Sequence, residues 1–407
     1  TPKIRFKGFT DAWEQRKLGE VSSKITKKNQ DIVVDEVFTN SAEYGIISQR
    51  DFFDKDIANF ENIDGYYIVE PNDFVYNPRI STTAPFGPIK RNKLERTGAM
   101  SPLYYVFRPH DIDLSYLECF FQTSCWHTFM RFNGNTGARS DRFAITDKVF
   151  DEMPISMPQD IEEQQKIGSY FSSLDNLITL HQRKCDETKQ LKKFMLQKMF
   201  PKNGEKNPEI RFEGFTDDWE QRKLGEVSSK ITKKNQDIVV DEVFTNSAEY
   251  GIISQRDFFD KDIANFENID GYYIVEPNDF VYNPRISTTA PFGPIKRNKL
   301  ERTGAMSPLY YVFRPHDIDL SYLECFFQTS CWHTFMRFNG NTGARSDRFA
   351  ITDKVFDEMP ISMPQDIEEQ QKIGSYFSSL DNLITLHQRK CEKLKELKKF
   401  MLQNMFV

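Results

Sequence analysis

The sequence predicts an α+β protein with two mixed α/β globular domains. We expect these domains to be separated by two long helices that pack as an antiparallel coiled coil with pseudo-two-fold symmetry. Three observations support this prediction: a long internal duplication, short alternating apolar runs within each copy, and a proline-free amphipathic stretch at the end of each copy. With 407 residues the chain has room for more than one core.

The duplication is the strongest feature of the chain. Trp13 aligns with Trp219 at an offset of 206 residues, and the 172 residues from Glu14 to Cys185 recur unchanged as Glu220 to Cys391. Repeats of solenoid proteins are much shorter, at about 20 to 50 residues, so this is a duplicated domain. Two copies of one fold imply two copies of one binding surface.

The globular part of each copy carries both strand and helix patterns. GYYIVEPNDFVYN (residues 65–77) and SPLYYVFRP (residues 101–109) alternate aromatic or β-branched residues with polar ones, as strands do. The stretch 114–132 reads as one amphipathic helix with Asp113 as its N-cap, and Thr146 is expected to cap a shorter helix.

A different pattern begins after Pro158. No proline follows until Pro201, and apolar residues recur at the spacing of a coiled coil. The predicted a and d positions are Ile167, Tyr170, Leu174, Leu177, His181, Leu191 and Met195. About forty residues at 1.5 Å each give a rod of roughly 60 Å. Its apolar stripe needs a partner, and because a globular domain separates the two rods, antiparallel packing is the simplest arrangement.

These patterns give the domain boundaries. The first globular domain is expected at 1–158 and the second at 209–364, followed by long helices at 159–200 and 365–407, respectively. The polar segment PKNGEKNP is expected to be a linker, at 201–208.

Composition narrows the class of protein. Lys and Arg number 54 against 60 Asp and Glu, a net charge of −6, so nucleic-acid contacts must come from local basic patches. No apolar stretch approaches the length of a membrane span, and no secretion signal is seen at the start of the sequence. The six cysteines form no C-x2-C pair, so we expect a cytoplasmic protein without structural disulfides or a metal site.

Two clusters of basic and amide side chains are candidates for DNA contacts. The first lies in NPRISTTAPFGPIKRNKLER and the second in the Gly-rich segment RFNGNTGARSDR. Arg and Lys suit phosphates and guanine edges, and Asn suits adenine edges. The predicted DNA-binding residues are Asn77, Arg79, Ser81, Thr82, Thr83, Lys90, Arg91, Lys93, Arg131, Asn133, Asn135, Arg139, Ser140 and Arg142, with the copies Asn283, Arg285, Ser287, Thr288, Thr289, Lys296, Arg297, Lys299, Arg337, Asn339, Asn341, Arg345, Ser346 and Arg348. Ordinary solvated surface is the alternative for each of them.

Motifs of catalysis are absent from the sequence. There is no GxxxxGK[ST] loop, no HExxH and no GxSxG. YNPR at residues 76–79 is only faintly similar to the catalytic tetrapeptide of amino-methyltransferases, and no glycine-rich cofactor loop precedes it. We therefore expect a chain that is not itself an enzyme.

Several motifs together resemble the specificity subunit of type I restriction-modification systems. They are WEQRKLGEV at residues 13–21, YGIIS and DFVYN, G-x-x-S-x-x-Y at residues 98–104, and PQDIEEQQKI at the start of the long helix, all present twice. The resemblance covers essentially the whole chain. It implies that each globular unit is a target recognition domain for one half of a split DNA sequence, and that the coiled coil sets the spacing and docks partner subunits.

The resemblance also implies the partners. Two modification subunits would carry S-adenosylmethionine and methylate adenine N6, and restriction subunits would add cleavage, so no cofactor is expected on this chain. Recognition domains of this family usually differ from each other, whereas here they are identical over 172 residues. We therefore expect an interrupted palindromic target. The alternative is a coiled-coil scaffold without DNA specificity of its own.

Overall fold

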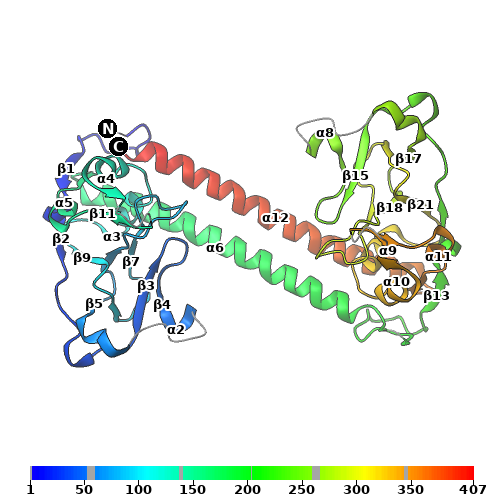
Figure 1. The fold of residues 1–407 in the computed structure, drawn as a ribbon, viewed down its shortest axis with the longest axis horizontal. Coiled ribbons are helices and arrows are strands. Elements are labelled where there is room, and N and C mark those ends of the chain that lie inside the picture. The colour runs from blue at the N-terminus through cyan, green and yellow to red at the C-terminus, as the bar shows by residue number, and fades with distance from the viewer. Residues whose placement is uncertain (1, 53–59, 137–140, 203, 259–265, 343–346) are drawn as a thin grey trace. The chain divides into compact units, whose positions relative to one another are not determined.

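The computed structural model describes residues 2–52, 60–136, 141–202, 204–258, 266–342 and 347–407 (Figure 1). The chain divides into two compact units, residues 1–182 with 389–407 and residues 183–388. Each unit therefore contains one globular domain and a segment of both long helices.

The first domain is built of short strands and short helices, and strand β12 leads into the long helix. Its strands are β1 (Glu14–Lys17), β2 (Ser22–Lys24), β3 (Val37–Ser41), β4 (Gly45–Ser48), β5 (Tyr67–Val69), β6 (Phe74–Tyr76), β7 (Ile89–Arg91), β8 (Gly98–Met100), β9 (Tyr105–Pro109), β10 (Asn135–Thr136), β11 (Phe143–Ala144) and β12 (Pro154–Met157). Its helices are α1 (Leu18–Val21), α2 (Gln49–Phe52), α3 (Leu114–Phe120), α4 (His127–Asn133), α5 (Asp147–Asp151) and α6 (Ile161–Lys198), with 3-10 turns at Gln30–Ile32 and Phe60–Gly65.

The second domain repeats this order at the same offset as the sequence. Its strands are β13 (Glu220–Lys223), β14 (Ser228–Lys230), β15 (Val243–Ser247), β16 (Gly251–Ser254), β17 (Tyr273–Val275), β18 (Phe280–Tyr282), β19 (Ile295–Arg297), β20 (Gly304–Met306), β21 (Tyr311–Pro315), β22 (Asn341–Thr342), β23 (Phe349–Ala350) and β24 (Pro360–Met363). Its helices are α7 (Leu224–Val227), α8 (Gln255–Phe258), α9 (Leu320–Phe326), α10 (His333–Asn339), α11 (Asp353–Asp357) and α12 (Ile367–Met405), with 3-10 turns at Gln236–Ile238 and Phe266–Gly271.

Two four-stranded sheets form the centre of each domain. In the first domain their strand orders are β4-β3-β8-β5 and β2-β9-β6-β7, and only the β3–β8 pair is parallel. Because side chains alternate along β6, Val75 packs with Phe38 and Met100 of the other sheet, whereas Phe74 faces the helical layer with Phe107. The predicted strands in residues 65–77 and 101–109 are thus confirmed.

The glycine that opens the G-x-x-S-x-x-Y motif has a packing role. A side chain at Gly98 would place its Cβ 2.3 Å from the Phe38 ring, so only glycine fits there. Six residues later, the Tyr104 hydroxyl lies 3.2 Å from Thr39 Oγ1 on the neighbouring strand of the same sheet. The motif therefore contributes to the contact between the two central strands of this sheet, β3 and β8.

The helical layer differs from the prediction in one place. Residues 114–132, expected as a single helix, form α3 and α4 with a turn between them. The Thr123 hydroxyl donates to Phe120 O at 2.7 Å and accepts from Cys125 N at 3.2 Å, so it replaces helical hydrogen bonds and ends α3. The caps are as expected, since Asp113 accepts from Tyr116 N and Thr146 accepts from Val149 N.

The start of α6 is fastened to its own domain by buried polar contacts. The Arg5 guanidinium binds the buried carboxylate of Glu163 through two hydrogen bonds of 2.7 and 2.8 Å. The Gln164 side chain accepts from Asp113 N at 2.9 Å and donates to Pro158 O at 2.8 Å. The residues of the PQDIEEQQKI motif therefore orient the long helix against the domain.

Within each unit the two long helices run antiparallel. In the second unit Lys192 of α6 contacts Asp381 of α12, and in the first unit Asp175 of α6 contacts Lys398 of α12. The buried stripe passes through Phe171 rather than Tyr170. Leu177 and Leu191 were therefore wrongly predicted as core positions, and both are more than 40% exposed.

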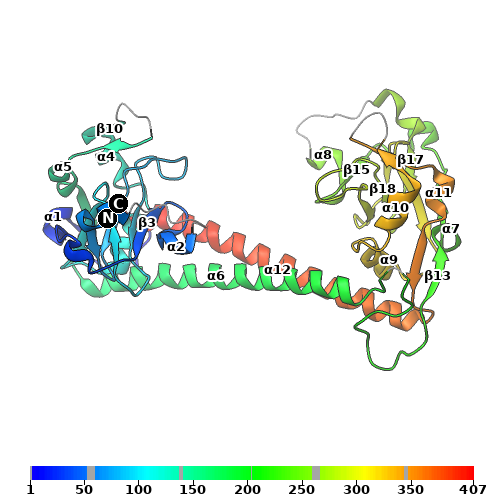
Figure 2. The same cartoon turned by 60° about the horizontal axis from the view of Figure 1, so that its bottom comes forward.

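The last residues of the chain complete the core of the first domain. The Phe406 ring lies 5.4 Å from the Tyr116 ring and 6.3 Å from the Trp13 ring, and Ile4 N donates to Asn404 O at 2.9 Å. The N and C labels accordingly lie together in both views (Figures 1 and 2). In the second unit Phe200, two residues after the end of α6, occupies the matching place beside Tyr322.

Candidate nucleic-acid interface

The structure brings the two predicted clusters together. Arg79 and Arg142 form a backbone bridge, Ile80 N donates to Asp141 O at 3.0 Å, and Phe143 N donates to Pro78 O at 2.8 Å. Segment 78–80 therefore lies against the start of β11, which itself pairs with β10. In the second domain Arg285 and Arg348 form the same bridge. Side chains about sixty residues apart in sequence thus share one surface, which we call the hairpin surface.

The hairpin surface carries uncompensated positive charge. In the first domain Arg79, Arg131 and Arg142 are exposed, and no carboxylate pairs with them among the residues that the structure describes. Asp141 is the acidic side chain of this segment, and it is exposed too. Within the first unit, β10 lies on the side away from α6 (Figure 2). Guanidinium groups in this state are free to bind phosphates or guanine edges.

The polar side chains around these arginines divide into two groups. Asn77 is used within the protein, because its amide donates to Asn40 O at 2.8 Å and its oxygen accepts from Arg79 N at 2.9 Å. Ser81 accepts from Ala84 N at 3.2 Å, which shapes the turn. Thr82, Thr83 and Asn135 are exposed. Asn77 therefore positions the loop, and the exposed side chains offer the contacts.

The predicted cations of β7, Lys90 and Arg91, and Lys93 just after this strand, make other contacts within the domain. Lys93 is 2.5 Å from the carboxylate of Glu118, and Arg91 binds Asn72 Oδ1 at 2.9 Å. Burial lowers the pKa of Lys90, as it does for its copy Lys296. These three cations are therefore partly neutralised or recessed, and the structure does not bring them to the hairpin surface. Their copies Arg297 and Lys299 approach Glu324 in the same way.

Four of the predicted residues lie outside the described part of the chain. These are Arg139, Ser140, Arg345 and Ser346. Their role in base contacts stays a prediction.

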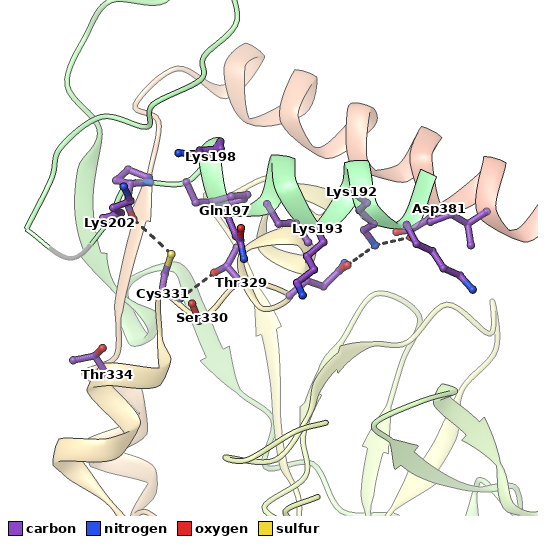
Figure 3. A pocket seen from close by; sticks show the side chains of 16 residues that line it. Lys192, Lys193, Gln197, Lys198, Lys202, Thr329, Ser330, Cys331, Thr334 and Asp381 are labelled. Atoms are coloured by element: carbon purple, nitrogen blue, oxygen red, sulfur yellow. Dashed lines mark hydrogen bonds and ion pairs between the residues drawn. The ribbon is translucent and has the colours of Figure 1, made fainter. Parts of the chain in front are cut away.

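A lysine-rich pocket on the long helices was not assigned from sequence. In the second unit it has a volume of about 940 Å³ and lies between the C-terminal half of α6 and the turn before α10 (Figure 3). Lys192 is held there by Asp381 Oδ1 at 2.5 Å and Gln328 Oε1 at 2.6 Å, whereas Lys193 has no ion pair with any described residue. The first unit has the matching pocket, of about 740 Å³, whose lining includes Thr83, Lys90 and Lys399. Lysines on a helix usually mark a solvated face, so no distinct feature of the sequence predicts this pocket.

A second pocket adjoins the hairpin surface. In the first domain it has a volume of about 500 Å³ and is lined by Tyr67, Leu103, Tyr104, Asn133 and Asn135, among others. The second domain has its counterpart, of about 510 Å³. Its walls are mainly aromatic and amide side chains, and Lys24 and Asp147 of its lining form an ion pair with each other.

Residues that could suggest catalysis have structural roles. Tyr76, the first residue of YNPR, is buried, donates to Phe86 O at 2.9 Å and stacks on Phe150 at 4.7 Å. Burial raises the pKa of the Cys119 thiol to about 12, so it is protonated at neutral pH. Over the described ranges no group of three or more His, Cys, Asp or Glu side chains is placed to hold a metal ion. In the same ranges no helix combines the length and apolarity needed to cross a membrane.

Comparison with known proteins gives a family match in both copies. Residues 10–190 and 216–396 each match the family model of the type I restriction modification DNA specificity domain. A curated relative, the type I restriction enzyme MjaVIII specificity subunit of Methanocaldococcus jannaschii, is 24% identical over 277 residues, which are 63% of this chain and 61% of that protein. The chain thus spans less than two thirds of that relative's length.

The fold matches a solved structure over its whole length. The crystal structure of the type I restriction-modification system S subunit from M. genitalium aligns with a TM-score of 0.62 at 12% identity, covering 100% of this chain and 99% of that one. At this identity the match concerns the fold. It agrees with two mixed α/β domains and two long helices.

Proposed function

Because the chain belongs to the family of type I restriction-modification specificity subunits, we propose that it binds DNA sequence-specifically and directs partner subunits to a bipartite target. Those partners would be two modification subunits that methylate adenine N6, and restriction subunits that cleave. The observation that carries the proposal is the hairpin surface, where Arg79 and Arg142 are joined by a backbone bridge and have no carboxylate partner among the described residues. Arg131, near the end of helix α4, is exposed and has no such partner either.

In this proposal the two kinds of basic group have different tasks. Exposed arginines and amides of the hairpin surface read base edges in a groove, and a bidentate arginine contact discriminates by about 1–3 kcal/mol. Lysines of the helix pocket, such as Lys193 and Lys399, contact phosphates and fix the register without reading sequence. The ion-paired residues Arg91 and Lys93 contribute less than their charge suggests.

We further propose that the target is an interrupted palindrome. The two domains have identical reading surfaces, so both should recognise the same short half-site. The helix contacts support a symmetric use of the copies, because Lys192–Asp381 and Asp175–Lys398 are the same contact with the copies exchanged. Two identical readers on opposite strands would recognise a half-site and its inverse complement.

The methyl donor belongs to the partners in this proposal. S-adenosylmethionine would be bound by the modification subunits, and this chain would position the DNA for them. Apolar side chains on the outer side of the long helices offer a docking face for those subunits; Leu177, Leu397 and Phe400 are each more than 40% exposed in the first unit.

A selection experiment tests the proposal against the scaffold alternative. The chain is assembled with its modification subunits and incubated with a random DNA library at fixed salt, and the bound fraction is sequenced. We expect one enriched bipartite motif. A complex that assembles but retains DNA without any enriched motif would favour a coiled-coil scaffold.

A further inference from the structure

A phenylalanine side chain at the end of helix α4, beside the hairpin surface, is exposed in each domain. Phe132, in the last turn of α4, is 81% exposed, and its copy Phe338 is 81% exposed as well. The neighbours Arg131 and Asn133 are also exposed, whereas Met130, one residue further back, is fully buried. A large apolar ring thus stands in water between groups that suit DNA.

The backbone that carries Phe132 is held firmly. Gly134 N donates to Met130 O at 3.0 Å, and the side-chain amide of Asn133 donates to Phe129 O at 2.8 Å. Two carbonyl groups of the last helical turn therefore have hydrogen-bond partners. A Cβ at Gly134 would lie 2.3 Å from the Phe143 ring, which shows how tightly β11 packs against this end. The ring is therefore presented from a fixed platform, at little further loss of conformational entropy on binding.

The charge of the neighbouring side chains indicates which kind of partner the Phe132 ring binds. Arg131 stands next to Phe132 in the chain and is exposed, as are Arg79 and Arg142 on the hairpin surface. None of these cations pairs with a carboxylate of the described residues. A protein partner would need an acidic rim around an apolar socket, whereas duplex DNA offers phosphates and stacked bases together. Proteins that deform DNA insert apolar side chains such as Phe between base steps and hold the neighbouring phosphates with cations.

We propose that Phe132 and Phe338 are wedges that insert between adjacent base pairs, one in each half-site. This proposal rests on the proposed DNA-binding function. Insertion unstacks one step and kinks the duplex, so steps that deform easily, such as pyrimidine–purine steps, are favoured at positions without hydrogen-bond readout. The wedges would thus add to specificity through the shape of the DNA.

The test uses the full chain assembled with its modification subunits. The target duplex carries 2-aminopurine, which brightens when unstacked, at one half-site position at a time and never at the adenine that becomes methylated. We expect one bright step with the unaltered chain, and loss of that signal with F132A/F338A. Since stacking an aromatic ring on a base contributes about 1–3 kcal/mol, affinity should fall about fivefold to 150-fold per half-site. F132W/F338W should keep the signal.

Controls separate the possible failures. V33A/V239A removes side chains of similar exposure, 76% each, away from the hairpin surface and should change nothing. Unchanged brightness and affinity in F132A/F338A would overturn the wedge while leaving DNA binding intact. Loss of subunit assembly in that variant would overturn it in favour of a protein contact. Absence of specific binding by the unaltered complex would instead contradict the proposed function.

Discussion

The ammonium nitrogen of Lys192 lies 2.5 Å from a carboxylate oxygen of Asp381. The copies of these two residues, Lys398 and Asp175, make the same contact in the first unit. In each unit the lysine comes from the C-terminal half of one long helix and the aspartate from the other helix. The duplicated sequence therefore builds the same antiparallel register twice, with the two helices in exchanged roles.

This register can be tested by removing one carboxylate. Lys192 is only 14% exposed and Asp381 is 44% exposed, so Asp381→Asn leaves a largely covered ammonium without its ion pair. We expect the free energy of unfolding to fall by about 1 kcal/mol, as for partly screened pairs. Glu187→Gln, which affects the solvent-exposed pair with Arg183, should have almost no effect. Equal shifts in the urea midpoint of both variants would contradict the role of the Lys192 pair.

The hairpin surface makes a prediction about DNA affinity. Arg142→Ala together with Arg348→Ala should weaken binding by about 1–3 kcal/mol per half-site and relax the choice of sequence, because a base-edge contact is lost. Arg96→Ala with Arg302→Ala is the matched control, since these arginines are engaged by Glu36 and Glu242. Fluorescence anisotropy on the target and on scrambled DNA measures both. Equal losses of DNA affinity in the two variants would contradict the prediction that the unpaired arginines bind DNA and the ion-paired arginines do not.

Stability should depend on pH through a half-buried histidine in each domain. Burial, and then the charge of Arg131, lowers the pKa of His127 below its usual 6.5, and His333 is affected in the same way. The unfolded chain then binds more protons than the folded chain as pH falls below about 6.5, so acidification destabilises the fold. The stabilisation is present above the ordinary pKa and is lost as pH falls through the folded value.

Thermal unfolding between pH 7.5 and 5 checks this. H127Q/H333Q should show a smaller loss of Tm on acidification than the unaltered chain. A steeper loss in H127Q/H333Q would have the wrong sign and contradict the argument.

The exposed apolar side chains of the long helices predict a docking defect. Phe400→Ser with Phe194→Ser removes rings that are 53% and 48% exposed, so folding should be nearly unaffected. If they are covered by modification subunits, assembly should weaken at least about tenfold, as expected for loss of buried aromatic anchors. Sedimentation of the mixed subunits measures this. Unaltered assembly would show that another face docks them.

Local patterns were sufficient to predict much of the fold. The duplication, the long helices, the strands around residues 65–77 and the caps at Asp113 and Thr146 all follow from spacing and residue type, and the structure agrees. The break between α3 and α4 was missed because it depends on one hydroxyl, that of Thr123, replacing backbone hydrogen bonds. The shift of the buried stripe from Leu177 was missed because an apolar residue also stands one position on, at Ile178.

The candidate site depended more on tertiary structure. Composition pointed to both basic clusters, but only the backbone bridge between Arg79 and Arg142 shows which parts of them meet. The pairing of Lys93 with Glu118 joins residues of different elements, so charge counting along the chain could not predict it. The exposure of Phe132 could not be predicted from the sequence either, because most phenylalanines of this chain are buried in the core.

Mapping the methylated adenines tests the central claim most directly. DNA from cells that express this chain with its modification subunits is read by single-molecule sequencing. Two identical recognition domains predict a split palindrome, with one methyl-adenine in each half and a spacer of fixed length. An asymmetric motif, or methylation without a bipartite motif, would contradict symmetric reading of the DNA by the two copies.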